Sequence, residues 1–332
     1  MSRFKRIQAV TVAAVTLTSG CVRAPDLTEV DQARDKAVRR SDHFQAVAYN
    51  GDVVVAGTDA GVLATSRDKG ASWKRAEVSP LSSITSIAAC PDKTFAALDF
   101  HHRVWTGNAG GGDWRPNLLG TKFAPTAITC AIDGRLWVVG SYSTIASSSD
   151  GGMSWTEQSL NADAILTTIQ FTDAMHGVVT GEFGTLATTS DAGATWHQQA
   201  VMPEEMYPLV AHFINANVGV IGNSEGKTYK TYDAGRTWSP LDNPSKVIFY
   251  SLAWDGVSLN GVGAGGQVAQ LCSHQWDEAQ GASRLPRDLL SVVSIGPNRL
   301  LGVGPSGTVE AVDVGSRPPP AERTSQAESS PS

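Results

Sequence analysis

Short apolar runs alternate with polar turn residues along most of the chain. Residues 44–78 hold four such runs, each rich in Val, Ala, Leu, Thr or aromatic residues and separated by Gly, Asp, Asn or Ser. Runs of this length and composition, bounded by turn residues, are typical of antiparallel β-strands. The four runs are 44–49, 52–57, 61–66 and 72–78. The same pattern returns further along the chain, so we predict an all-β protein.

The strand pattern repeats with a fixed period, which two independent series of residues mark. Tryptophans stand at positions 73, 114, 155, 196, 238 and 276, with steps of 41, 41, 41, 42 and 38 residues. Glycine-bounded turns fall between them at 57–61, 140–144, 181–184, 222–226, 263–266 and 304–307, and residues 98–102 occupy the missing place. Repeats of about 41 residues with four strands each are typical of β-propellers. We therefore predict a seven-bladed β-propeller of four-stranded antiparallel blades over residues 41–315.

The two ends of the repeat array differ from its middle. The seventh unit, residues 289–314, is too short for a fourth strand, so ring closure requires a strand from elsewhere. We predict that residues of about 34–42 supply it, and that residues 22–40 otherwise form a tether. Residues 316–332 carry three successive prolines followed by Ser and Glu, with too little apolar content to pack, and we expect them to be disordered.

The N-terminus has the pattern of an export signal. Basic residues at positions 3, 5 and 6 precede an apolar run over 7–17, which is too short to span a bilayer as a helix. The ending Ser19-Gly20-Cys21 resembles a bacterial lipobox, which implies that residues 1–21 are a signal peptide and that Cys21 is lipidated. Thr18 stands where lipoproteins usually carry Leu, so ordinary cleavage and a coincidental cysteine are the alternatives. The resemblance implies the periplasmic side of the envelope, and Val22 favours the outer membrane.

The remaining cysteines are Cys90, Cys130 and Cys272, an odd number for an exported chain. Cys90 and Cys130 are 40 residues apart, close to one period, and we expect them on the same strand of neighbouring repeats. We interpret them as buried free thiols, because cysteine packs well as a small apolar residue. A disulfide is the alternative, and it requires Cα atoms within about 7 Å.

In four repeats the tryptophan is the last residue of an eight-residue motif of the form S/T-x-D-x-G-x-S/T-W. A looser copy spans residues 106–114, and a last remnant keeps only Trp276. The carboxylate and hydroxyl can bond the backbone N–H groups of a tight hairpin, glycine supplies the unusual backbone conformation, and the indole fills the gap between strands. Identical positions in successive blades lie far apart, so we predict a structural motif rather than a catalytic or metal site. The four copies are Ser66, Asp68, Gly70 and Trp73; Ser148, Asp150, Gly152 and Trp155; Thr189, Asp191, Gly193 and Trp196; and Thr231, Asp233, Gly235 and Trp238.

This motif resembles the Asp-box, also called the bacterial neuraminidase repeat. The longer segments from Gly181 to Trp196 and from Gly222 to Trp238 resemble the repeat of the photosystem II stability/assembly-factor-like family. That resemblance covers about residues 44–314. It implies a single propeller without catalytic activity that binds a protein through one face, with the boxes between the third and fourth strands on the opposite face.

Partner-binding residues are therefore expected on the glycine-bounded turns and on the connections between blades. The segment 202–207 is the most distinctive of these, because two methionines and a tyrosine could offer an adaptable apolar contact. Ordinary loop packing is the alternative. The candidate partner-binding residues are Tyr142, Glu182, Phe183, Met202, Met206 and Tyr207.

These observations favour a monomeric, lipid-anchored scaffold that binds a protein in the cell envelope, in assembly or beside a transporter. A formal net charge of −6 and the absence of a basic stripe argue against nucleic acid as partner. We predict no catalytic residue, cofactor or metal. The alternatives are a sialidase-like or other glycoside hydrolase and a glycan-binding module. The sialidase alternative expects an arginine ahead of the first box, and residues 41–50 contain none.

Overall fold

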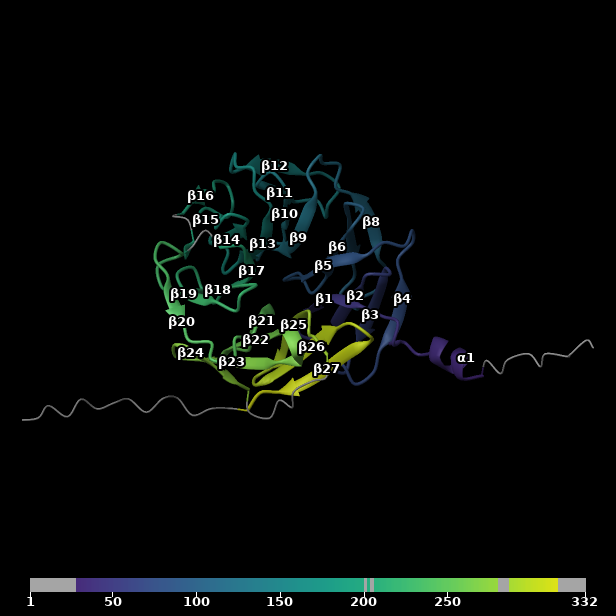
Figure 1. Ribbon diagram of the computed structural model, residues 1–332. Helices are drawn as coiled ribbons and strands as arrows, with labels where there is room; N and C mark the ends of the chain where they lie inside the picture. Colours follow the sequence, from purple (N-terminus) through teal and green to yellow (C-terminus); the bar gives the residue numbers. More distant parts are fainter. Residues whose placement is uncertain (1–27, 200–201, 204–205, 280–286, 316–332) are drawn as a thin grey trace, which may run out of the picture. The chain divides into compact units, whose positions relative to one another are not determined.

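The computed structural model describes residues 28–199, 202–203, 206–279 and 287–315, and it divides at Lys36 into two units. The first unit holds the short helix α1 (Thr28–Arg34), which lies within the segment expected to be a tether. The second unit, from Ala37 onward, holds the strands, and they form seven antiparallel sheets (Figure 1). The predicted seven-bladed propeller is confirmed.

The strands are numbered in chain order. Blade 1 contains β1 (Phe44–Tyr49), β2 (Val54–Thr58), β3 (Val62–Ser66) and β4 (Lys74–Glu77), and blade 2 contains β5 (Ile84–Ala89), β6 (Phe95–Asp99), β7 (Arg103–Gly107) and β8 (Arg115–Leu118). Blade 3 contains β9 (Pro125–Cys130), β10 (Leu136–Gly140), β11 (Thr144–Ser148) and β12 (Thr156–Ser159), and blade 4 contains β13 (Leu166–Phe171), β14 (Gly177–Gly181), β15 (Leu186–Thr189) and β16 (His197–Gln198). Blade 5 contains β17 (Pro208–Phe213), β18 (Gly219–Asn223), β19 (Thr228–Thr231) and β20 (Ser239–Leu241). Blade 6 contains β21 (Phe249–Trp254), β22 (Leu259–Gly263), the 3-10 turn η2 (Ala264–Gly266), β23 (Val268–Cys272) and β24 (Gln275–Glu278), and blade 7 contains β25 (Ser291–Gly296), β26 (Arg299–Gly304) and β27 (Thr308–Asp313).

Within each blade the strands pair in chain order, and burial is greatest in the second strand and least in the fourth. The second strand is buried at every residue in blades 1 to 6, as in β2 and β10, while the fourth strand is mostly exposed, as in β4 and β12. The second strands are accordingly near-continuous apolar runs, because both of their faces are covered. The continuous apolar runs of the repeat thus mark the second strand of each blade.

The core of the ring is divided among the contacts between blades. In the described residues seven hydrophobic clusters are found, and each joins side chains of two adjacent blades. Glycine at the end of the second strand permits the connecting chain to cross closely. A Cβ atom on Gly140 would lie 2.0 Å from the Ala124 carbonyl oxygen, and one on Gly263 would lie 1.9 Å from that of Ile248. The glycine-bounded turns seen in the sequence therefore mark where successive blades meet.

The ring closes differently from our expectation. Blade 7 has three strands in the described part of the chain, and residues 37–43 form turns instead of the predicted fourth strand. Asp42, which is 2% exposed, makes the junction. Its carbonyl oxygen accepts a hydrogen bond from the Gly307 N–H of blade 7 at 2.6 Å, and its carboxylate pairs with Arg75 of blade 1 at 2.9 Å. One buried aspartate thus joins the first and last blades, together with the apolar cluster around Phe44 and Leu301.

Cys90 and Cys130 form a disulfide, with a Cα–Cα distance of 5.1 Å. The interpretation as free thiols was therefore wrong. Cys90 follows the last residue of β5 and Cys130 ends β9, so the bond joins the inner strands of blades 2 and 3. Their position near the ring axis, where neighbouring strands converge, brings the two sulfur atoms within bonding reach.

Three predictions concern segments outside the described residues: the signal peptide 1–21, lipidation at Cys21 and the disordered tail 316–332. No helix in the described ranges is long and apolar enough to cross a membrane.

Candidate protein-binding face

Successive hairpins in each blade alternate between two faces of the ring. The turns between first and second strands and between third and fourth strands share one face, which carries the Asp-boxes and is called the box face here. The turns between second and third strands and the connections between blades lie on the other, called the connection face. The structure therefore places the boxes opposite the candidate partner-binding residues, as predicted.

Each box is held by hydrogen bonds within its own hairpin. In blade 3 the Ser148 hydroxyl donates to Asp150 at 2.8 Å and accepts from the Gly152 N–H at 2.8 Å. Ser154 donates its N–H and its hydroxyl to the same carboxylate, at 2.9 and 2.6 Å. The equivalent bonds recur in the boxes of blades 1, 4 and 5. Every box carboxylate is therefore engaged by donors of its own turn.

These bonds keep the box aspartates ionised. The Ser154 hydroxyl, then its N–H and the Ser148 hydroxyl, lower the pKa of Asp150 from 3.8 to about 2. The pKa values of Asp68, Asp191 and Asp233 are also about 2, because each receives the same set of bonds. A carboxylate with so low a pKa carries no proton near neutral pH and cannot act as a general acid.

The box glycines also join one blade to the next. Gly193 has a φ of 82°, which favours glycine, and a Cβ there would lie 2.2 Å from the ring of Trp137 in the preceding blade. A Cβ on Gly235 would likewise lie 2.1 Å from Leu186. The box indoles are partly buried, and Trp155 Nε1 donates to the Gly152 carbonyl at 3.2 Å. These contacts support the structural role predicted for the motif.

On the connection face, turns and blade connections are linked in series by backbone hydrogen bonds. The Phe100 N–H donates to Ser83, and the Ser143 N–H donates to Ala164 at 2.7 Å. Further round the ring, the Gly184 N–H donates to the Met206 carbonyl at 3.0 Å. Blades 2 to 4 therefore present a continuous, backbone-bonded surface on this face.

Large apolar side chains are exposed along that surface. We call this set the apolar arc: Leu81, Phe100, Tyr142, Ile165, Phe183 and Tyr207. Each comes from a turn or connection of blades 2 to 4 or from the connections that flank them. The corresponding turns of blades 5 to 7 carry small or polar residues, such as Ser224, Gly265 and Ser306. Several large apolar side chains exposed on one face are a feature of interaction surfaces.

Two aromatic residues of the arc occupy unfavourable backbone conformations. Tyr142 has a φ of 57° and Phe183 a φ of 55°, in the left-handed region that bulky residues rarely adopt. The same turn position holds Gly265 in blade 6 and Ser306 in blade 7. The two rings gain little packing in return, since Tyr142 is 65% and Phe183 67% exposed. Backbone strain combined with exposure is a reason to look for a binding role.

The half-buried Glu182 and the exposed Tyr207 have distinct roles. The Glu182 carboxylate accepts a hydrogen bond from the Ile165 N–H at 2.9 Å, so it fixes the connection between blades 3 and 4. Partial burial, and secondly the nearby charge of Glu182, raise the pKa of the Tyr207 phenol. Glu182 therefore positions the arc and Tyr207 contributes to its surface.

Met202 and Met206 do not lie on the surface, which corrects our expectation for the segment 202–207. They are 1% and 5% exposed and pack with Leu186 and Phe213 in the cluster between blades 4 and 5. Hydrogen bonds from the Met202 N–H to the Gly184 carbonyl and from the Gly184 N–H to Met206 fold the segment inward. The methionines support the turn that carries Phe183 rather than contacting a partner.

Sequence reasoning missed three members of the arc, Leu81, Phe100 and Ile165. Each is the only exposed large apolar residue of its turn or connection, so no periodic pattern distinguishes it. Their turn positions, read together with those of Tyr142 and Phe183, would have been the available signal.

Among the described residues no group of three or more His, Cys, Asp or Glu is arranged to hold a metal ion.

The fold and its four bonded boxes define an Asp-box seven-bladed β-propeller. Residues 108–244, which include three of the intact boxes, match the family model described as "Photosynthesis system II assembly factor YCF48". The chain is thus an Asp-box propeller that resembles the photosystem II assembly-factor family. A comparison with curated protein sequences finds no match.

Several solved propellers share the fold. A structure titled "YCF48 bound to D1 peptide" has a TM-score of 0.68 at 15% identity, over 82% of this chain and 93% of its own. YCF48 from Cyanidioschyzon merolae has a TM-score of 0.69 at 13% identity, over 82% and 96%. A catalytically inactive virginiamycin B lyase from Staphylococcus aureus with quinupristin has a TM-score of 0.70 at 11% identity, over 82% and 96%. At these identities the likeness is one of fold.

Proposed function

We propose that this protein is a non-enzymatic scaffold of the bacterial envelope whose apolar arc binds a protein partner during assembly or beside a transporter. The observation that carries the proposal is the pair of exposed aromatic residues on left-handed turns, Tyr142 and Phe183. Strained aromatic tips reduce stability, so their presence is explained by a contact made outside the chain. Aromatic side chains are also enriched at the centres of protein interfaces.

The nature of the partner follows from the surface. The arc offers apolar rings and aliphatic side chains along a run of backbone-bonded turns, which suits a protein segment with its own apolar side chains. The solved structure of YCF48 with a D1 peptide supports peptide recognition by a propeller of this kind. The box aspartates are hydrogen-bonded within their own hairpins and provide no catalytic acid or base, which supports a role without catalysis.

The location we propose is the periplasmic side of the envelope, with Cys21 as lipid anchor at the outer membrane. The Cys90–Cys130 disulfide supports an exported chain, because structural disulfides persist in oxidising compartments. A Cys21→Ser variant tests the anchor. We expect it to move from the membrane fraction to the soluble fraction and to lose incorporation of labelled fatty acid. Equal membrane association of both chains would contradict the anchor.

The binding proposal is tested by affinity capture from envelope extract. The bait variant carries Tyr142→Gly and Phe183→Gly, which remove both rings and suit the left-handed turns. The control is Met153→Ala, because Met153 is 74% exposed but lies on the box face. We expect the double variant to lose the partner retained by the wild type and by the control. A partner retained equally by all three would contradict the assignment to the arc.

A further inference from the structure

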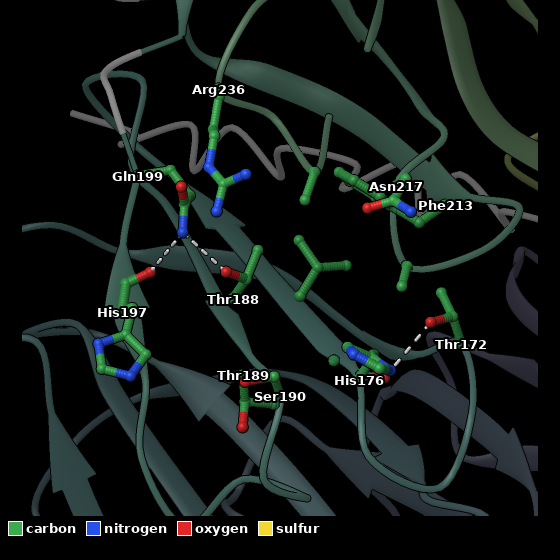
Figure 2. A pocket seen from close by; sticks show the side chains of 14 residues that line it. Thr172, His176, Thr188, Thr189, Ser190, His197, Gln199, Phe213, Asn217 and Arg236 are labelled. Carbon is green, nitrogen blue, oxygen red and sulfur yellow. Dashed lines mark hydrogen bonds between the residues drawn. The ribbon is translucent and has the colours of Figure 1, made fainter. Parts of the chain in front are cut away.

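A cavity of about 400 Å³, lined by both apolar and polar side chains, opens between blades 4 and 5 on the box face, away from the apolar arc. Its volume lies within the range of small-ligand sites. Figure 2 shows the Arg236 side chain extending into this space toward Gln199 and Thr188. Further polar side chains line the cavity, namely Thr172, His176, Ser190, His197 and Asn217.

A side chain that bridges two other pairs of adjacent blades takes a different direction here. In blade 2 the Asn117 amide donates to the Gly151 carbonyl of the next box at 3.2 Å, and in blade 3 the Gln158 amide donates to Gly193 at 2.9 Å. Gln199 occupies the same place in blade 4, three residues after the box tryptophan. It turns back instead and donates to Thr188 at 2.8 Å. Gln199 therefore lines the cavity without bridging blades 4 and 5. An equivalent cavity of about 310 Å³ lies between blades 3 and 4, where Gln158 makes the bridge.

A second difference places a positive charge at the opening. The residue after the box glycine is Ala71 in blade 1, Met153 in blade 3 and Ala194 in blade 4, but it is Arg236 in blade 5. Within the described part of the chain the Arg236 guanidinium makes no ion pair or hydrogen bond. His176 faces the same cavity but already pairs with Asp173 at 2.9 Å. Arg236 is thus the one lining cation whose charge is not matched by a described carboxylate.

We propose that this cavity, called the Arg236 cavity, binds a small ligand that carries one carboxylate and several hydroxyl groups, as a sugar acid does. The planar guanidinium group binds a carboxylate through two parallel hydrogen bonds. Amide and hydroxyl groups of Asn217, Ser190 and Thr172 are suited to the ligand's hydroxyls. A single unmatched cation fits a ligand with a single negative charge better than a dianion. The ligand can be a free sugar acid or the terminal residue of an acidic polysaccharide.

Calorimetric titration of the purified chain tests the proposal with D-glucuronate as probe, beside neutral D-glucose, inorganic phosphate and an oligosaccharide ending in glucuronate. We expect glucuronate to bind at least about tenfold more tightly than glucose, which is the effect of one charged hydrogen-bonding pair. Tighter binding of the oligosaccharide would identify the polysaccharide as the source. Tighter binding of free glucuronate would identify the sugar acid itself.

The Arg236→Ala variant should weaken glucuronate binding about tenfold or more. Alanine is the residue that the boxes of blades 1 and 4 carry at this position, so the hairpin is expected to fold normally. Arg115→Ala is the control, since it removes another exposed arginine and changes the net charge equally. Equal binding of glucuronate by Arg236→Ala and the wild type would overturn the proposal. So would equal affinity for glucose or phosphate, or no heat of binding up to about 10 mM.

The cavity and the apolar arc are on opposite faces, so their tests are independent. Tyr142→Gly with Phe183→Gly should leave glucuronate binding unchanged, and Arg236→Ala should leave partner capture unchanged. Loss of glucuronate binding in the double arc variant would contradict a separate site.

Discussion

The box face and the connection face of this propeller are built from the same number of turns, yet they use them differently. On the box face, equivalent positions in blades 1, 3, 4 and 5 carry the same residue types and make the same hydrogen bonds. On the connection face, one turn position holds Tyr142, Phe183, Gly265 and Ser306 in blades 3, 4, 6 and 7. Positions that keep the same residue type in every box hold the blades together. Positions where the residue type differs between blades indicate a role specific to one blade.

Left-handed residues make the comparison sharper. Ala192 in the box of blade 4 has a φ of 57°, much like the 55° of Phe183. The box offsets this backbone cost, because its turn presents donors to Asp191 and lets Gly193 approach Trp137. The Phe183 turn gains no such packing for its ring, which is mostly in solvent. The same local strain therefore has a structural explanation on one face and a binding explanation on the other.

The largest expected effect concerns the disulfide, which lies at the ends of the inner strands toward the box face. It closes a segment with a sequence separation of 40 residues. Replacing Cys90 and Cys130 by Ser should lower the unfolding free energy by about 4 kcal/mol, through the larger entropy of the unfolded chain. Denaturant unfolding with and without reductant measures this. If the unfolding of the wild-type chain were insensitive to reductant, the disulfide would be contradicted. Partner capture by the Ser variant should be unchanged.

The next effect concerns the box tryptophan. Trp155→Ala should lower stability by about 3 kcal/mol, because a partly buried indole and its bond to Gly152 are lost. Thermal unfolding measures the change, and Met153→Ala in the same box is the control that should unfold like the wild type. If Trp155→Ala melted normally but lost a ligand, the box face would have to be reassigned as a binding face.

A smaller, graded effect is expected with pH. The box aspartates have pKa values of about 2 in the folded chain, against 3.8 when unperturbed. Because the folded values are lowered, the stability they contribute is present above about pH 4 and is lost as pH falls toward 2. The melting temperature should therefore decrease through this window. In Asp150→Asn the decrease should be shallower, and an equal decrease in both chains would show that the box carboxylates are not its source.

The smallest effect on stability is expected on the connection face. Phe183→Gly should leave the unfolding free energy unchanged or raise it by up to about 1 kcal/mol, because glycine adopts the left-handed conformation without steric cost. Denaturant unfolding of the purified variant checks this. A clear loss of stability would mean that the ring is held by the fold, and the strain argument for binding would fail.

The repeat made most of the fold predictable. Apolar runs, box tryptophans and crossing glycines each recur with one period, so the strands, the seven blades and the role of the boxes followed from the sequence. Ring closure did not follow, since Asp42 joins blades 1 and 7 through one carbonyl and one carboxylate, and such a contact has no pattern. The disulfide was missed because cysteine also packs well as a small apolar residue, so the near-period spacing of Cys90 and Cys130 fitted a free pair as well as a bonded one.

The binding face was only partly predictable. Tyr142, Phe183 and Tyr207 could be recognised, because turn positions can be counted from the glycines. The burial of Met202 and Met206 depends on backbone bonds that fold their loop under Gly184, and composition alone suggested exposure. Likewise the residues that line the Arg236 cavity come from separate turns of blades 4 and 5, and only the packing of the two blades brings them together.

The separation of stability from binding between the two faces is tested most directly by measuring both properties on the same two variants. Melting temperature and partner capture are compared for Trp155→Ala and for Tyr142→Gly with Phe183→Gly, against the wild type. We predict that Trp155→Ala melts at a lower temperature and still captures the partner below that temperature. The double variant should melt like the wild type and fail to capture the partner. The opposite pattern, with binding lost in Trp155→Ala and retained in the double variant, would contradict the account.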